Sequence, residues 1–116
     1  MSEVLAYLAG IFEGEGTAGL AKIRKHHQYR YISPRIRVSM TDKEAVAVFH
    51  ERFHGSMYLQ HSPSMVRHGY KPVWSWCAQH LQALEVAQTL LPFMRIPRKK
   101  KQMESIVTHY AGRRVR

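Results

Sequence analysis

Residues 4–12 form an uncharged apolar segment at the start of the chain. Ser2 is a good N-cap and Glu3 suits a first helical turn, so a helix is expected here. Gly14 and Gly16 are typical of a helix end. Such a helix is apolar on every face and has to be buried on more than one side. In a chain of 116 residues the first helix has few neighbours, which indicates contact with a second subunit.

From Thr17 the hydrophobic pattern changes to a period of two, which indicates strands. Segments 17–26 and 31–40 form a hairpin that turns near residues 27–28, and segments 57–61 and 73–78 form a second pair of strands around a long loop, 62–72. Thr41 or Asp42 begins the helix between the pairs, and Gly55 ends it. Helices are also expected over 80–91 and after Pro97. The chain is therefore one α+β domain over residues 1–116, with the order αββαββα and a further helix at its end.

Both late helices have an expected buried stripe. The stripe of the first is Leu81, Leu84, Ala87 or Gln88, and Leu91, and that of the second is Met103, Ile106, Val107 and Tyr110.

Positive charge is segregated along the chain, with 18 Lys and Arg against 8 Asp and Glu and a net charge of +10. No acid lies between Glu15 and Asp42 or between Glu51 and Glu85, and basic residues crowd 95–101. A basic stripe of this kind is typical of a nucleic-acid binder. The alternative is a solvated surface that only aids solubility. A membrane-surface role is disfavoured because the basic segments are expected as strands.

Other features narrow the class of protein. Cys77 is the only cysteine, which excludes an internal disulfide framework and fits a reducing compartment. No apolar run reaches the roughly 18 residues of a membrane helix, and no basic leader precedes the apolar N-terminal segment. We therefore expect an intracellular, soluble protein with no membrane partner, in the cytoplasm or in an organelle with its own genome.

Two carboxylates, Glu13 and Glu15, follow the apolar helix and are flanked by glycines. Gly10 and Gly14 are one turn apart and would let a second helix approach closely. A carboxylate at a helix C-terminus opposes the helix dipole and calls for a cation. Doubled in a dimer, such a carboxylate would provide hard oxygen ligands for Mg²⁺. The alternative is that both are solvated helix-end charges.

Residues 8–16, Leu-Ala-Gly-Ile-Phe-Glu-Gly-Glu-Gly, resemble the signature motif of the LAGLIDADG homing endonuclease family. The expected element order and the Leu-Pro-Phe-Met-Arg segment before a Lys-rich helix extend the resemblance over nearly the whole chain. The resemblance implies a half-domain with a curved antiparallel sheet, and a homodimer because the chain has one motif. It also implies metal-dependent cleavage of double-stranded DNA at a long, near-palindromic site, by a protein encoded in an intron or another mobile element.

The resemblance also implies individual roles. Glu15 is the metal-binding acid, Gly14 offers a backbone carbonyl to the metal, and Glu13 is more structural. The metal is Mg²⁺, which Mn²⁺ or Ca²⁺ can replace in binding. Lys99 matches a basic residue near the scissile phosphates, with Arg98 and Lys100 as alternatives because Pro97 is an extra residue. Met40 departs from the family, which often has a water-ordering Gln there.

Two surfaces follow from this reading. The expected dimer interface comprises Leu5, Leu8, Ala9, Gly10, Phe12 and Glu13. The expected DNA-contacting set comprises Lys22, Arg24, His26, Tyr31, Ser33, Arg35 and Arg37 on the first hairpin, with Gln60, Ser62 and Arg67 on the second hairpin and its loop.

Two other functions compete with DNA cleavage. The first is a non-cleaving module on the same scaffold, either an RNA maturase for intron splicing or a DNA-binding regulator. The second is a zinc peptidase, because His50, Glu51 and His54 fit the H-E-x-x-H pattern, in which two imidazoles one helical turn apart bind zinc. Gly55 ends that helix at once, and no third ligand stands at a familiar spacing.

Overall fold

The computed structural model describes residues 2–25 and 28–114, and side chains within residues 3–22 and 32–112. The expected alternation of helices and strand pairs is present, with short helical additions. In chain order the elements are α1 (Ser2–Glu15), β1 (Gly16–Lys25), β2 (Gln28–Met40), α2 (Lys43–Phe53), β3 (Ser56–Gln60), α3 (Pro63–Arg67), β4 (Val73–Gln79), α4 (Leu81–Leu90), the 3₁₀ turn η1 (Leu91–Phe93) and α5 (Pro97–Arg114).

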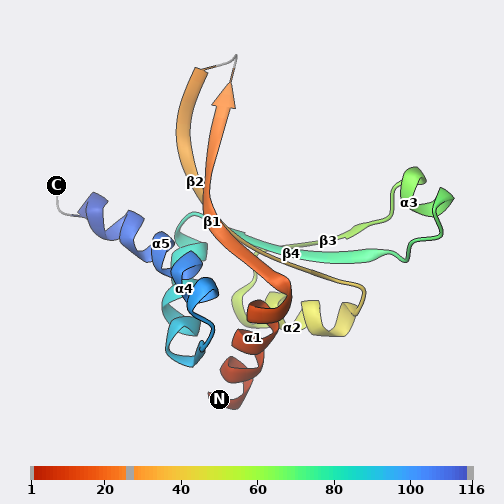
Figure 1. Ribbon diagram of the computed structural model, residues 1–116, viewed down its shortest axis with the longest axis horizontal. Coiled ribbons are helices and arrows are strands. Elements are labelled where there is room, and N and C mark those ends of the chain that lie inside the picture. The colour runs from red at the N-terminus through yellow and green to blue at the C-terminus, as the bar shows by residue number, and fades with distance from the viewer. Residues whose placement is uncertain (1, 26–27, 115–116) are drawn as a thin grey trace.

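The four strands form one antiparallel sheet in the order β1-β2-β4-β3. The long β1–β2 hairpin rises as one arm, and β3 and β4 extend as a second arm that carries α3 at its end (Figure 1). The two arms diverge from a shared base, and α1, α2 and α4 gather on one side of that base (Figure 1). The other side of the sheet is left open between the arms.

Strand alternation determines which side chains meet the helices. On the covered face, Ile36 pairs with Ala78 and Val38 pairs with Trp76, and all four are fully buried. The Trp76 ring stacks on Phe49 at 5.0 Å between centroids, and its Nε1 donates to the His54 carbonyl at 2.5 Å. The core therefore lies between the sheet base and the helices.

Within one subunit, helix α1 is buried on one side only. Leu8 and Phe12 are fully buried in the core of this subunit, whereas Val4 and Tyr7 are 44% and 51% exposed. One face of α1 is thus covered by its own chain, and an apolar stripe remains on the surface. Among the described residues, no helix has both the length and the apolar character needed to cross a membrane.

Two segments near the ends of β3 and β4 also differ from expectation. The expected loop 62–72 contains α3, because Ser62 Oγ accepts from Met65 N–H at 3.2 Å and caps a helix that starts with a proline.

In α4 the buried residues are Ala83, Val86, Ala87 and Leu90, and Leu81 is 68% exposed. The two alanines let α4 pack closely on the core, and Leu81 lies on the outward face of the helix. In α5, Met103 and Ile106 are buried as expected.

Candidate functional site

The two carboxylates at the end of α1 have different surroundings. Glu13 Oε2 accepts from the backbone N–H groups of Arg95 and Ile96, at 2.6 and 2.5 Å. A carboxylate that pairs with two amides in this way fixes the segment before α5. Glu13 is therefore engaged within its own subunit, which differs from its expected place at a dimer interface.

Glu15 is exposed at the last position of α1 and lines a hollow of about 310 Å³ with Ser39, Met40, Thr41, Asp42 and Val73. Asp42 occupies the N-cap position of α2, but its side chain makes no capping hydrogen bond. Among the described residues, the carboxylates of Glu15 and Asp42 have no hydrogen-bond or ion-pair partner. Two free carboxylates thus share one hollow beside the end of α1.

Lys99 lies beneath this helix end and is only 6% exposed. Its Nζ donates to the Gly16 carbonyl oxygen and lies 5.7 Å from the centroid of the Phe12 ring. Burial, and then the neighbouring charge of Arg98, lower the pKa of Lys99. In this subunit the Lys99 ammonium is therefore bound to the backbone at the end of α1, and its expected place near scissile phosphates stays a prediction. Arg98 is exposed and Lys100 is half-buried.

The junction between α1 and β1 is tightly packed against α5. A Cβ at Gly16 would lie 2.3 Å from Phe12 Cδ1, so only glycine fits there without a shift. One turn along α5 from Lys99, Gln102 Oε1 accepts from Ala18 N–H at 3.0 Å. The start of α5 thus binds the first residues of β1 and determines the backbone around Glu15.

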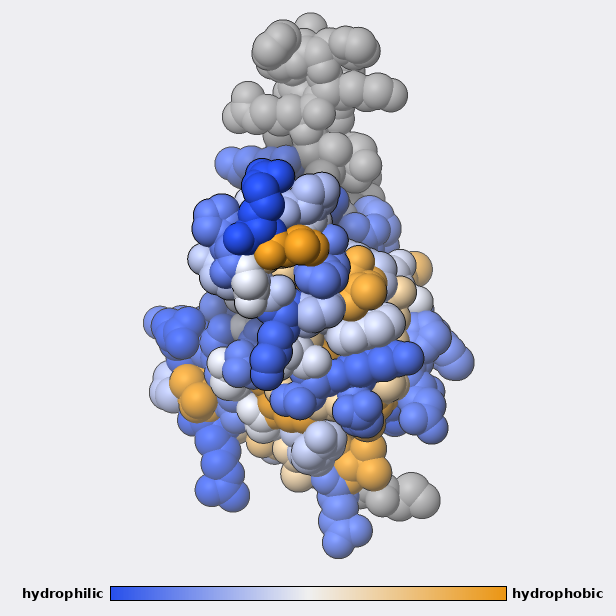
Figure 2. Space-filling view, turned by 90° about the vertical axis from the view of Figure 1, so that its right-hand side faces the viewer, coloured by the Kyte–Doolittle hydropathy of each residue, from blue (hydrophilic) through white to orange (hydrophobic). Residues whose placement is uncertain are grey.

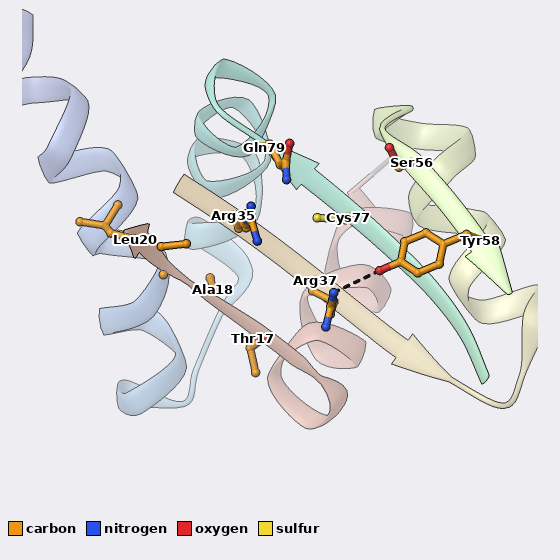
Figure 3. A pocket seen from close by; sticks show the side chains of 11 residues that line it. Thr17, Ala18, Leu20, Arg35, Arg37, Ser56, Tyr58, Cys77 and Gln79 are labelled. Atoms are coloured by element: carbon orange, nitrogen blue, oxygen red, sulfur yellow. Dashed lines mark hydrogen bonds between the residues drawn. The ribbon is translucent and has the colours of Figure 1, made fainter. Parts of the chain in front are cut away.

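The open face of the sheet holds a second hollow, of about 540 Å³. Arg35, Arg37, Tyr58 and Gln79 line it, together with Ser56 and Cys77, as Figure 3 shows. The Arg37 Nη2 donates to Tyr58 Oη at 3.1 Å (Figure 3). Arg35 and Arg37 are exposed here, in agreement with their expected outward position.

The other expected DNA contacts on the first hairpin differ. Lys22 pairs with Ile32 and so shares the face of Ile36, whereas Gly19 pairs with Arg35. Lys22 is exposed, but on the opposite side of the sheet from Arg35. Ser33 shares the face of Arg35 but is 2% exposed, so it is buried and not free to contact DNA. The side chains of Arg24 and Tyr31 lie outside the part of the chain whose side chains are described. His26 lies outside the described residues altogether.

The second arm carries the remaining candidates. Gln60 is exposed, but its Oε1 accepts from Ser75 Oγ at 3.2 Å. Ser62 is the N-cap of α3, and Arg67 is exposed at the end of that helix. Hydrophilic side chains dominate the face seen in Figure 2, with hydrophobic ones scattered among them. Exposed polar side chains are thus available at the end of the second arm.

The expected dimer interface on α1 needs the most revision. Leu8, Ala9 and Phe12 are fully buried in the core of their own subunit because they form its inward stripe. Leu5 is half-buried, and Gly10 is exposed. The outward stripe consists of Val4, Tyr7, Gly10 and Gly14.

The zinc-site alternative has an unsuitable geometry. His54 follows the last residue of α2 and has a positive φ of 66°. It therefore does not continue the helical face on which His50 lies. Both histidines are exposed.

Sequence reasoning missed Tyr58, Asp42 and Ser39 as residues of these two hollows. It also missed Ser75, whose Oγ lies 2.8 Å from that of Ser39. The alternation in residues 56–60 is the signal for Tyr58, because Ser56, Tyr58 and Gln60 share one face of β3. Ser75 has no such signal, because its role depends on the pairing of β4 with both neighbours.

No family model matches the chain, and no curated protein is similar to it in sequence. Among solved structures, the homing endonuclease I-CvuI, in complex with a DNA target, is 13% identical with a TM-score of 0.68, over 89% of this chain and 62% of that one. The LAGLIDADG homing endonuclease I-GzeII, with its DNA target, is 14% identical with a TM-score of 0.67, over 94% of this chain and 36% of that one.

The group I intron-encoded homing endonuclease I-CeuI, complexed with DNA, is 18% identical with a TM-score of 0.65, over 93% of this chain and 54% of that one. The chain spans less than two thirds of the length of each of these proteins. The chain has the fold of the LAGLIDADG homing endonucleases.

Proposed function

We propose that the chain is a site-specific endonuclease that acts as a homodimer and hydrolyses double-stranded DNA at a long, near-palindromic site with Mg²⁺. The observation that carries the proposal is the free carboxylate of Glu15 at the end of α1, beside a sheet face that presents arginines. The structures of I-CvuI, I-GzeII and I-CeuI support it, since these homing endonucleases were determined with DNA.

The open sheet face is the proposed DNA-binding surface. Arg35 and Arg37 project from the central part of the sheet, and a net charge of +10 attracts the phosphate backbone. Arginine binds the O6 and N7 atoms of guanine in the major groove through a bidentate pair. We assign Arg37 to base recognition, because Tyr58 fixes its guanidinium. Gln60 and Arg67 on the second arm extend the surface.

The chemistry of the hollow at the end of α1 fits a hard divalent cation. Glu15 and Asp42 offer carboxylate oxygens without partners of their own, and Mg²⁺ prefers oxygen ligands. Mn²⁺ and Ca²⁺ prefer oxygen ligands too and are expected to substitute in binding. The I-CvuI complexes, determined with Mg or Ca, support this. When bound, such an ion stabilises the charge that develops on a phosphate during hydrolysis.

One subunit is not enough for a complete metal site. Among its described residues, no three His, Cys, Asp or Glu side chains are grouped to hold a metal. Gly14 lies in the last turn of α1, where backbone carbonyls lack helical partners, and we propose it as a further oxygen ligand. The remaining ligands come from a second subunit, DNA or water.

Lys99 is proposed as a positioning residue rather than as a contact to the phosphates. Its buried ammonium binds the carbonyl of Gly16 and thereby orients the backbone next to Glu15. Arg98 is exposed at the start of α5 and is the better candidate for a phosphate contact.

The homodimer is proposed to form through the outward stripe of α1. Val4 and Tyr7 provide exposed apolar surface, and Gly10 and Gly14 let a second helix approach. Two-fold packing of this helix would bring two copies of Glu15 together and match a near-palindromic site. Because I-CeuI is intron-encoded, we also propose that this chain is encoded in an intron or a free-standing mobile element.

A second candidate function is a non-cleaving module that binds DNA or intron RNA. The position of Met40 favours this candidate, because Met40 lines the hollow with Glu15 and packs partly against the core. A thioether is a weak hydrogen-bond acceptor and orders water poorly.

Cleavage of a randomised plasmid library with Mg²⁺ tests the proposal. We expect the wild type to cut at one recoverable, near-palindromic motif, and Glu15→Gln to lose more than about 100-fold of the rate. Glu104→Gln is the matched control, because Glu104 is exposed on α5 away from the hollow and carries the same charge. Tight DNA or RNA binding without cleavage by the wild type would refute the nuclease and favour the second candidate.

A further inference from the structure

Three polar side chains form a hydrogen-bonded chain across the open face of the sheet. Ser39 on β2 lies 2.8 Å from Ser75 on β4, measured between the two Oγ atoms. Ser75 Oγ donates to Oε1 of Gln60, at the end of β3, at 3.2 Å. Ser39 and Ser75 are directly paired in the sheet, so the strand register itself brings the two hydroxyls together.

The hydrogen bond from Ser75 to Gln60 sets the direction of the bond between the two serines. A serine hydroxyl has one proton, and that of Ser75 is donated to Gln60. The proton between the two serines must therefore come from Ser39. Ser75 is fully buried, so solvent does not offer its hydroxyl a competing acceptor. The Ser39 oxygen consequently has lone pairs to offer and no proton to give.

Ser39 also lines the hollow that contains Glu15 and Asp42. Its oxygen and the two free carboxylates all accept hydrogen bonds. Thr41, the other hydroxyl of the hollow, is exposed after the end of β2, and among described residues nothing fixes its proton. A water molecule in this hollow can donate one proton to Ser39 and the other to a carboxylate. Its lone pair then points away from the protein.

We propose that Ser39 is a positioning residue for the water that attacks DNA, and that Ser75 and Gln60 orient its hydroxyl. This inference rests on the proposed function. In the step, the water oxygen forms a bond to phosphorus, and the phosphorus–oxygen bond to the leaving nucleoside breaks. The attacking water gives its proton to solvent, and the leaving oxygen takes a proton from solvent. Ser39 thus supplies the water contact that the thioether of Met40 does not provide.

Single-turnover cleavage at saturating enzyme tests the role of Ser39. We expect Ser39→Ala to lower the rate about tenfold, the effect of one lost hydrogen bond. DNA affinity, measured with Ca²⁺, should not change. Ser39→Thr restores the hydroxyl on a strand and should restore the rate. Ser105→Ala is the matched control, because Ser105 lies on α5 and lines neither hollow.

Two substitutions of the exposed Gln60 test the direction of the hydrogen bonds between Ser39, Ser75 and Gln60 without disturbing the core. Gln60→Glu can only accept a hydrogen bond and, at saturating enzyme, should cleave faster than Gln60→Ala. Gln60→Ala frees the Ser75 proton to turn toward Ser39 and should lower the rate severalfold. If Ser39→Ala does not fold, the two Gln60 variants still test the proposal, because equal cleavage rates for Gln60→Ala and wild type would overturn it.

A crystal structure with DNA and Ca²⁺ provides a readout that does not depend on activity. We expect an ordered water within hydrogen-bond distance of Ser39 Oγ, and its loss in Ser39→Ala. If the wild type cleaves and Ser39→Ala cleaves equally fast, the inference fails and the nuclease stands. If the wild type does not cleave, the proposed nuclease fails. A loss of rate matched by an equal loss of DNA affinity would mean that Ser39 is structural, which overturns the inference.

Discussion

The buried ammonium of Lys99 donates a hydrogen bond to the carbonyl of Gly16, the residue that follows Glu15 in the chain. A cation is favourable at this place because the carbonyl end of α1 carries partial negative charge. Lys99 therefore satisfies the helix end from within, and Glu15 remains free at the surface. Lys99 thus compensates the partial charge of the helix end, and the carboxylate of Glu15 stays available for a metal ion.

Replacing Lys99 with Met should change how stability depends on pH. Burial and Arg98 lower the pKa of Lys99 below the ordinary value of 10.5. Between the lowered and the ordinary pKa, the unfolded state binds more protons than the folded state, so this residue's contribution to stability rises with pH. The free energy of unfolding of the wild type, relative to Lys99→Met, should thus increase as pH rises toward 10.5. Urea denaturation of both proteins at several pH values measures this difference in the free energy of unfolding.

The exposed Lys101 provides the control, since Lys101→Met should leave the pH dependence unchanged. A constant difference between the wild type and Lys99→Met would show that the Lys99 ammonium is not desolvated.

Replacing Glu13 or Glu15 with Ala should change the free energy of unfolding by very different amounts. Glu13→Ala leaves the N–H groups of Arg95 and Ile96 without their acceptor and should lower the free energy of unfolding by about 2–3 kcal/mol. Glu15→Ala removes an exposed carboxylate without partners and should change it by less than about 0.5 kcal/mol. Thermal or urea unfolding compares the two, and equal losses would contradict the division of roles.

The glycines of α1 and of its junction with β1 allow a matched pair of substitutions. Gly16→Ala places a Cβ against Phe12 and should cost about 1–3 kcal/mol of stability. Nothing within the subunit lies within 4 Å of a Cβ at Gly10, so Gly10→Gln should fold at least as well as the wild type. The same change would obstruct close helix packing and should raise the dimer dissociation constant, measured by sedimentation equilibrium. A Gly10→Gln protein that dimerises normally would place the subunit contact elsewhere.

Arg37 and Lys22 test which face of the sheet binds DNA. Arg37→Ala should weaken binding by about 1–3 kcal/mol and relax the preference at one base position. Tyr58→Phe, which removes the acceptor for Arg37 Nη2, should weaken binding by about 1 kcal/mol. Lys22→Ala should have little effect, because Lys22 lies on the face of Ile36. Titration of labelled duplex at fixed salt measures all three, and a larger effect at Lys22 would reverse the assignment.

The sequence predicts the order of elements and the outward position of Arg35 and Arg37, because hydrophobic periodicity shows which residues of one strand share a face. It does not show how two strands are registered. The placement of Lys22 opposite Ile32 depends on the hairpin register, which shifts between Ile23 and Arg24. A one-residue error in such pairing moves a side chain to the other face.

The basic cluster at the start of α5 has a similar ambiguity. Residues 98–101 are all basic, and only the helical phase relative to Gly16 decides that Lys99 is buried. The burial of Leu8 and Phe12 in their own subunit likewise depends on the approach of α4 and the sheet. These contacts are tertiary, so a pattern within one segment does not determine them.

The bonds that hold the end of α1 against α5 join residues 82 to 84 positions apart. During synthesis, the first helix and both hairpins are made before the residues that complete this corner. Contacts of such long range form late, after the loop between them has closed. A nascent or truncated chain that lacks α5 would thus carry an arginine-bearing sheet without an ordered Glu15. The proposed nuclease would acquire its active site only after α5 has packed against the end of α1.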